Sequence, residues 1–219
     1  MTSRADSPSS RDKILDVAEA LFARRGFAGV GMREVAEAAH LGKSSLFHHF
    51  KTKAHLYLAV LARVLDRIAE RTLPVLGDSR SPLERLDASV DALVDALAEH
   101  PTTARLLLRG LFEDDDLPEI AQDESRAVER TLGGILQGVQ DLLREGIDSG
   151  ALRPVSVPHT LQTLIGATVY HFASGKFGED LLDRPLLSAE AVRQRKQEVK
   201  ALLRHGLAAP QSPNRGESR

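Results

Sequence analysis

Residues 32–53, "MREVAEAAHLGKSSLFHHFKTK", decide how this chain of 219 residues is interpreted. Apolar side chains recur at helical spacing up to Ala39, and a second, shorter helix is predicted where Leu46 and Phe50 lie four positions apart. Between them, Gly42 is the residue with free access to unusual backbone dihedral angles. Two short helices joined by such a turn form a helix-turn-helix, whose second helix enters the major groove of B-DNA.

The second of these helices carries a polar face suited to DNA. If its two apolar residues anchor the helix, the other side presents Lys43, Ser44, Phe47 and His48. Hydroxyls and imidazole can meet phosphates and base edges, and an aromatic edge can pack on a sugar or a thymine methyl group. The chemistry therefore favours a DNA recognition helix over a solvated face of a purely structural bundle.

The wider stretch from Gly26 to Leu56 resembles the DNA-binding region of the TetR/AcrR family of bacterial transcriptional regulators. In that family a glycine and an aromatic residue close the first helix, a second helix has the form hR(D/E)hAxxA, a recognition helix reads SKGTLYHHF, and a lysine opens the fourth helix. The detailed match covers about residues 11–58, and beyond it only the number, lengths and order of the helices agree. The matching residues are Gly26, Phe27, Arg33, Val35, Ala36, Ala39, Lys43, Leu46, His48, His49, Phe50 and Lys53.

The chain departs from the family pattern at several positions. Gly31 and Gly42 stand where Thr or Ser usually cap the second and third helices, which costs only a few tenths of a kcal/mol. Phe47 replaces a tyrosine whose hydroxyl bonds a DNA phosphate, so one phosphate contact is expected to be lost. Ser44 and Ser45 stand for Gly-Thr. The resemblance, with the exposed face of the helix, implies DNA contacts by Arg33, Lys43, Ser44, Ser45, Phe47, His48 and Lys53.

Composition and charge restrict the remaining function classes. The absence of cysteine excludes a disulfide scaffold, thiolate metal sites and cysteine nucleophiles. Residues 1–53 hold nine Lys or Arg and six Asp or Glu, whereas residues 54–219 hold twenty and twenty-five, so the positive charge that phosphate binding needs is local to the N-terminal quarter. With no signal peptide and no apolar run of about 18 residues, we expect a cytoplasmic protein that joins the nucleoid when bound to DNA and does not enter a membrane.

Enzyme and metal chemistry find no support in the motif. His48 and His49 are adjacent, so on a helix they point about 100° apart and cannot chelate one ion. A serine nucleophile would need a base oriented by a third group, and no spacing indicates one. The acidic run at residues 113–116 is interpreted as a solvated connector. We expect no catalytic residue, metal or cofactor.

The rest of the chain predicts further helices. Since no stretch alternates with period two, the sequence predicts an all-α fold of about nine helices. Pro74 is expected to stop the fourth helix and Pro101 the fifth. A helix is predicted over residues 103–112, and a long one from near Pro118 to about Gly150. The last two helices are predicted to begin at Ser156 and Ser188 and to end near Gly175 and Gly206.

Helix caps and composition divide the chain into four segments. Expected N-caps include Ser9 or Ser10, Thr52, and Ser81, the last with Pro82 and Glu84 in a capping box. The polar ends are expected to be disordered tails. The segments are residues 1–10, a tail; 11–53, the helix-turn-helix domain; 54–207, the effector-binding and dimerisation domain; and 208–219, a second tail.

The resemblance implies a sequence-specific regulator that binds double-stranded DNA. One helix-turn-helix discriminates poorly, whereas two on a two-fold axis read a palindromic operator. Similar proteins dimerise through their last two helices, where small and apolar residues allow close approach here. The residues expected at the dimer interface are Gly166, Ala167, Ala173, Val192, Val199, Leu202 and Leu203.

By the same resemblance, a small molecule binds among helices five to eight, shifts helix four and releases a repressor from DNA. The Leu- and Val-rich helices suggest a mainly apolar or lipid-like effector. The alternative is a helical dimeric adaptor without DNA binding, which would lack salt-dependent affinity for DNA. The candidate pocket residues, each explained equally well by core packing, are Arg105, Arg109, Phe112, Gln140, Tyr170 and His171.

Overall fold

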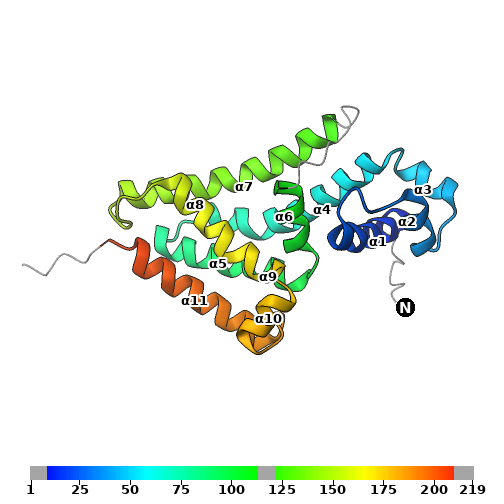
Figure 1. Ribbon diagram of the computed structural model, residues 1–219. Coiled ribbons are helices and arrows are strands. Elements are labelled where there is room, and N and C mark those ends of the chain that lie inside the picture. The colour runs from blue at the N-terminus through cyan, green and yellow to red at the C-terminus, as the bar shows by residue number, and fades with distance from the viewer. Residues whose placement is uncertain (1–8, 113–121, 210–219) are drawn as a thin grey trace, which may run out of the picture.

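The structure, a computed structural model, describes residues 9–112 and 122–209 (Figure 1). Across these two ranges every regular element is a helix, and the only strand-like pairing is an antiparallel bridge between Leu152 and Ala208, so the all-α prediction is confirmed. The elements are α1 (Ser10–Arg25), α2 (Met32–Ala38), α3 (Lys43–His49), α4 (Lys53–Leu76), α5 (Pro82–Glu99), α6 (Thr103–Phe112), α7 (Gln122–Asp148), α8 (Val157–Ile165), the π-helix η2 (Gly166–Tyr170), α9 (His171–Ala173), α10 (Lys176–Leu182) and α11 (Ala189–Leu207).

Figure 1 shows a small N-terminal unit and a larger C-terminal unit that α4 joins. Helices α1 to α3 and the start of α4 form the small unit, and in the larger unit α5, α6 and α7 pack against the rest of α4 while α11 packs on α5. Helix α4 has 24 residues, which is about 36 Å at a rise of about 1.5 Å per residue. One helix therefore runs from beside the helix-turn-helix into the core of the larger unit.

The N-terminal unit forms around α1, which packs against α2, α3 and α4. Its buried face includes Ile14 and Phe22, both without exposed surface. The helix begins after Ser9, whose hydroxyl accepts a hydrogen bond from the Asp12 N–H at 3.1 Å, so Ser9 is the N-cap of the two candidates, Ser9 and Ser10. It ends at Gly26, where a φ of 69° favours glycine.

Two predicted caps of the next long helices are confirmed, and one predicted stop is wrong. The Thr52 hydroxyl accepts from the His55 N–H at 3.1 Å, and Ser81 forms the capping box with Glu84. Helix α4, however, does not stop at Pro74 but continues to Leu76. Leu76 is buried, and its carbonyl accepts a hydrogen bond from Nε of Arg85 at 3.1 Å. Tertiary contacts therefore hold the end of the helix that follows the proline.

The predicted eighth helix is present but irregular. Helices α8, η2 and α9 follow one another from Val157 to Ala173, with a π-helical turn in the middle. Within that turn the Ala167 carbonyl accepts a hydrogen bond from the guanidinium of Arg195 on α11. A side chain that inserts into the backbone ladder in this way is a known cause of irregular helical turns.

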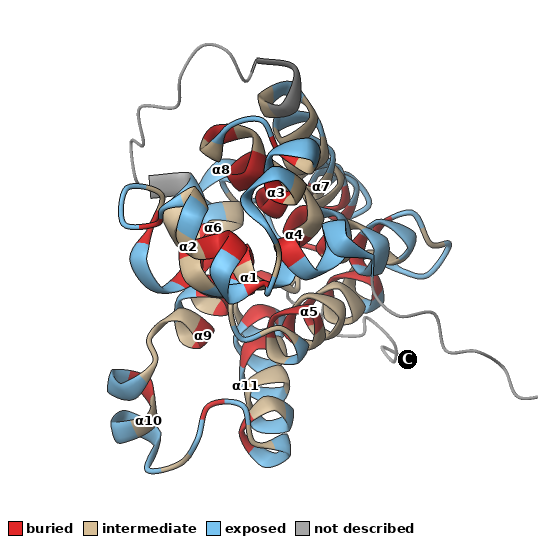
Figure 2. Ribbon diagram, turned by 90° about the vertical axis from the view of Figure 1, so that its right-hand side faces the viewer, coloured by how far each residue is buried: buried red, intermediate tan, exposed pale blue. Residues whose placement is uncertain are grey.

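Helix α10 was not predicted, since no helix was expected between Gly175 and Ser188. Gly175 has a φ of 56° and turns the chain into α10, and Asp183 ends it in the left-handed conformation. In Figures 1 and 2 this helix stands apart from the body of the larger unit.

The described residues include the inner end of each predicted tail, residues 9–10 and 208–209. Ser10 is already helical. Ala208 pairs with Leu152, and the Ala209 N–H donates to the Ala151 carbonyl at 3.2 Å, so backbone hydrogen bonds hold the two residues after α11. Residues 1–8 and 210–219 lie outside the described residues, as does the acidic run 113–116 and the predicted start of the long helix.

Three ion pairs join α5 to α11 along one side of the bundle. Asp95 pairs with Lys196 at 2.6 Å, Asp91 with Lys200 at 2.8 Å, and Asp87 with Arg204 at 2.5 Å. The positions are four residues apart on each helix and run in opposite directions. They fix the register of two antiparallel helices.

Candidate DNA-binding surface and effector cavity

The predicted recognition helix is present and turns its predicted face to solvent. Leu46 on α3 and Phe50 just after it are fully buried, as the anchoring residues should be. Lys43, Ser44 and His48 are exposed, and Phe47 keeps 37% of its surface exposed. The Lys43 ammonium lies 5.7 Å from the centre of the Phe47 ring. A cation and an aromatic ring are thus presented together at the tip of the small unit.

The turn between α2 and α3 uses a different residue from the one expected. Gly42 has an ordinary φ of −67° and serves as the N-cap of α3 without a side-chain hydrogen bond. His40 takes the left-handed conformation instead, with a φ of 54°. The Leu41 N–H reaches the Ala36 carbonyl at 2.9 Å, which closes the end of α2. The positive φ of this turn is therefore at His40, two residues before the predicted Gly42.

Two further residues from the DNA-contact prediction lie on the same unit. Arg33 is exposed on α2, and Ser45 is half-buried on α3. Gly31 and Gly42 cap α2 and α3 with no side-chain hydrogen bond, as the departures from the family pattern suggested. DNA contact by each of these residues stays a prediction.

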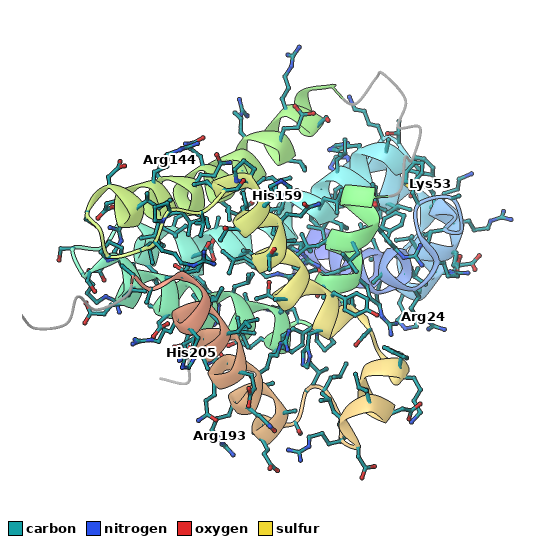
Figure 3. All side chains as sticks on the ribbon, turned by 60° about the vertical axis from the view of Figure 1, so that its left-hand side comes forward. Arg24, Lys53, Arg144, His159, Arg193 and His205 are labelled. Atoms are coloured by element: carbon teal, nitrogen blue, oxygen red, sulfur yellow. The ribbon has the colours of Figure 1, made fainter. Side chains whose placement is uncertain are left out.

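Lys53 has a structural partner inside the protein. Its ammonium donates to the Phe27 carbonyl at 2.9 Å and lies 4.3 Å from the centre of the Phe27 ring. Figure 3 labels Lys53 among the side chains of the N-terminal unit. The contact ties the start of α4 to the turn after α1, so a structural role explains this lysine and its DNA contact stays a prediction.

A buried carboxylate connects the two units. Glu19 of α1 is 5% exposed and accepts hydrogen bonds from Nη2 of Arg63 and Nη2 of Arg67 on α4, both at 2.7 Å. The hydroxyl of Thr102, which precedes α6, donates to it at 2.6 Å. Burial alone raises the pKa of Glu19, but the hydrogen bonds from Arg67, Thr102 and Arg63 outweigh it and lower that pKa below its usual value. The carboxylate therefore holds α1, α4 and the start of α6 together.

An apolar cavity of about 90 Å³ lies in the larger unit, between α4, α5, α7 and α8. Its wall contains no charged side chain. The lining residues are Ile68, Thr72, Leu76, Leu86, Ser89, Val90, Leu93, Ile135, Leu136, Val139, Leu142, Leu161, Leu164, Ile165 and Thr168.

The three hydroxyls in this wall already donate to their own helices. Thr72 bonds the Ile68 carbonyl at 2.8 Å, Thr168 the Leu164 carbonyl at 2.8 Å, and Ser89 the Arg85 carbonyl at 2.7 Å. The wall therefore offers a ligand no spare hydroxyl proton. Cavities with such walls stay dry and take apolar guests.

The six residues predicted for an effector pocket do not line this cavity. Arg105 and Tyr170 are exposed, Arg109 is half-buried, and Gln140 accepts a hydrogen bond from Arg144 at 2.9 Å on an exposed side of α7. The side chain of Phe112 lies outside the described residues. Aliphatic residues at helical spacing form the cavity, and in a sequence they cannot be distinguished from ordinary core.

His171, the sixth, lines a different and smaller pocket of about 70 Å³ beside α10 and α11, with Arg184, Arg195 and Glu198. Burial, and then the positive charge of Arg195, lower the pKa of His171 to about 4. The imidazole is therefore neutral at physiological pH.

The residues predicted for a dimer interface divide into two groups. Val199 and Leu203 are buried within this single chain, where α11 packs on α5, so they are not available to a partner. Gly166 and Leu202 are exposed, and Ala167, Ala173 and Val192 are half-buried. Figure 3 labels Arg193 near the start of α11 and His205 near its end, both exposed.

Two further properties concern residues 9–112 and 122–209 taken together. None of the helices there is long and apolar enough to span a membrane. Over the same residues, no group of three or more His, Cys, Asp or Glu side chains is placed to hold a metal ion.

Comparison with known proteins gives matches over both units. The family model for bacterial regulatory proteins of the tetR family matches residues 14–60, and the model for a tetracyclin repressor-like C-terminal domain matches residues 82–202. The HTH-type transcriptional repressor KstR2 of Mycolicibacterium smegmatis is 31% identical over 153 residues, which are 68% of this chain and 72% of that protein. The HTH-type transcriptional activator FasR of the same species is 34% identical over 121 residues, 54% of this chain and 53% of that one.

Solved structures share the fold. The ketosteroid regulator KstR2 of Mycobacterium tuberculosis superposes with a TM-score of 0.74 at 23% identity, covering 95% of this chain and all of that one. AibR, solved with isovaleryl coenzyme A and operator DNA, gives a TM-score of 0.72 at 20% identity, covering 89% and 97%. Together with the exposed recognition helix, these matches show that the chain belongs to the TetR family of bacterial regulatory proteins and is a DNA-binding regulator of transcription.

Proposed function

We propose that the protein is a homodimeric repressor that an apolar effector releases from a palindromic operator. Residues 11–53 form its DNA-binding domain, and residues 54–207 bind the effector and the second subunit. The observation that carries the effector part is the apolar cavity whose wall includes Ile68, Thr72 and Leu76 of α4, the helix that also enters the DNA-binding unit.

On the DNA side, Lys43, Ser44, Ser45, Phe47 and His48 contact the operator, with Arg33 on the preceding helix. Phosphate contacts set affinity and its salt dependence, whereas contacts to base edges set specificity. The Phe47 ring has no hydroxyl for a phosphate, so its contribution is apolar contact with a sugar or a thymine methyl group. A second subunit doubles these contacts and requires a palindromic site.

On the effector side, the ligand has an apolar chain or ring. A carboxylate inside this wall would find neither a charge nor a spare donor, so any polar group of the effector stays at the mouth of the cavity. The relatives support this class, since AibR was solved with isovaleryl coenzyme A and a FadR with stearoyl coenzyme A. A ligand that fills the space best when α4 is displaced favours the arrangement that does not fit DNA.

The experiment measures release of protein from an operator, identified first by selection from random DNA. The probes are isovaleryl and stearoyl coenzyme A, titrated into the complex and, by calorimetry, into the protein alone. Val139→Phe should fill the cavity and abolish release while operator affinity is kept. Ile147→Phe, on the same helix but outside the lining, is the matched control.

Each part of the proposal can fail separately. If a probe binds and operator affinity is unchanged, effector control through this cavity is wrong. If Val139→Phe and Ile147→Phe respond alike, the ligand binds elsewhere. If no sequence is selected and binding to DNA does not fall with salt, the protein is a helical adaptor.

A further inference from the structure

Four of the eight large apolar side chains that are exposed within the described residues lie on α10 and its flanks. We call residues 175–188 the α10 arm. Phe177 is 63% exposed and Leu181 74% exposed, and the two lie four residues apart on one side of α10. Leu182 and Leu187 are exposed as well. A concentration of large apolar side chains at the surface marks an interaction site.

The arm is held out by a small core of its own. Leu186 and Ala191 are buried although they lie outside the main hydrophobic core. Gly178 is buried against Ser174 and Leu186, so close that a Cβ there would lie 2.1 Å from the Ser174 hydroxyl oxygen. The exposed side chains therefore sit on an ordered support, and the same chain offers them no cover.

Outside this arm, the surface expected to form the dimer exposes two large apolar side chains among the described residues, Tyr170 on η2 and Leu202 on α11. Val199 and Leu203 are used inside the single chain, and the exposed residues of α11 are mostly polar, with Leu202 as the large apolar exception. The arm joins α9 to α11 in the chain and projects beside them (Figures 1 and 2). It is thus continuous with the two helical faces that the proposed homodimer uses, and it adds four exposed apolar side chains to them.

We propose that the α10 arm packs on a second copy of this chain, with Phe177 and Leu181 as its anchoring side chains. The inference rests on the proposed homodimer. In a two-fold interface the same patch is buried twice, so each exposed side chain contributes to two equivalent contacts. Apolar anchors that become fully buried at the centre of an interface carry much of its affinity.

The test compares dimer dissociation constants by sedimentation velocity over a range of protein concentrations. The variant is Phe177→Gln with Leu181→Gln, and the control is Leu73→Gln, which removes an exposed apolar side chain of α4. We expect the arm variant to raise the dissociation constant at least tenfold and the control to leave it unchanged. Because the altered side chains are exposed in the single chain, circular dichroism and the thermal midpoint of the monomer should be retained.

A second readout uses the absence of native cysteine. In a Leu181→Cys variant, the thiol should react with a disulfide reagent at least tenfold more slowly when the protein is concentrated enough to dimerise than when it is dilute. Equal dissociation constants for wild type and arm variant, with equal thiol reactivity in both states, would overturn the inference and leave the homodimer standing. A wild-type protein that stays monomeric at every concentration and on DNA would overturn the homodimer itself. Binding of the wild type, but not the arm variant, to anionic lipid vesicles, with no change in dimerisation, would assign the arm to a membrane surface instead.

Discussion

Removal of the Glu19 carboxylate should weaken the protein more than any other single change at the junction of the two units. Glu19 receives two guanidinium hydrogen bonds and one hydroxyl hydrogen bond while almost fully buried. Breaking a buried ion pair costs about 3–5 kcal/mol. Arg63 and Arg67 keep 23% and 24% of their side-chain surface exposed and can recover part of their hydration. We therefore expect Glu19→Ala to lower the free energy of unfolding by about 3 kcal/mol.

Asp16→Ala is the matched control, because Asp16 pairs with the same Arg63 at 2.7 Å but is 66% exposed. An exposed pair of this kind contributes at most about 1 kcal/mol. Urea unfolding followed by circular dichroism measures both variants. If the two lose the same small amount of stability, the three hydrogen bonds to Glu19 do not hold the units together and the reasoning is refuted.

The stability of Glu19→Gln, measured against pH, tests the direction of the pKa shift of Glu19. The pKa of Glu19 is lower in the folded state than in the unfolded state. Its charge therefore stabilises the fold fully above the pKa of an unfolded glutamate, which is about 4.3. This stabilisation is lost as pH falls through the lower folded pKa. The difference between wild type and Glu19→Gln should therefore be largest at neutral pH and shrink below about pH 4. A difference that grows on acidification would contradict this.

Three further changes test separate features. His40→Gly should stabilise the protein by about 1 kcal/mol, because His40 has a φ of 54°, and His40→Val should destabilise it; thermal unfolding measures both. His171 has a pKa of about 4 in the folded state and about 6.5 in the unfolded state. The unfolded state therefore binds a proton that the folded state does not, and the free energy of unfolding should fall as pH drops between these values. Urea unfolding at several pH values measures this fall, which should be smaller in His171→Gln. Gly146→Ala should destabilise the fold by about 1–3 kcal/mol, since its Cβ would lie 2.5 Å from Leu152 Cδ1, whereas Gly133→Ala on the same helix meets nothing within 4 Å and should not.

Local signals in the sequence predicted much of the fold. A serine or threonine that caps a helix acts on its neighbours in the chain, so Ser9, Thr52 and Ser81 could be identified from spacing alone. The same holds for Leu46 and Phe50, whose four-residue spacing fixed the buried side of the recognition helix and thereby its exposed side.

Features that depend on distant partners could not be predicted. Helix α4 continues past Pro74 to Leu76, a buried residue whose carbonyl accepts a hydrogen bond from Arg85 on another helix. The π-helical turn is joined to Arg195, which lies 28 positions from Ala167. The cavity arises where four helices leave space between leucine, isoleucine and valine side chains, and no single stripe of such residues signals a void. The void exists only where the four helices pack against one another.

The central claim is that two copies of α3 read a palindromic DNA site. Selection of random duplex DNA on the purified protein, followed by sequencing and by binding at two salt concentrations, tests it most directly. We expect a palindromic consensus whose affinity falls steeply with salt, because the protein releases condensed counterions from the phosphates. We also expect loss of that consensus when Lys43 and His48 are both replaced by alanine. Failure of any sequence to enrich, or a consensus without two-fold symmetry, would contradict the claim.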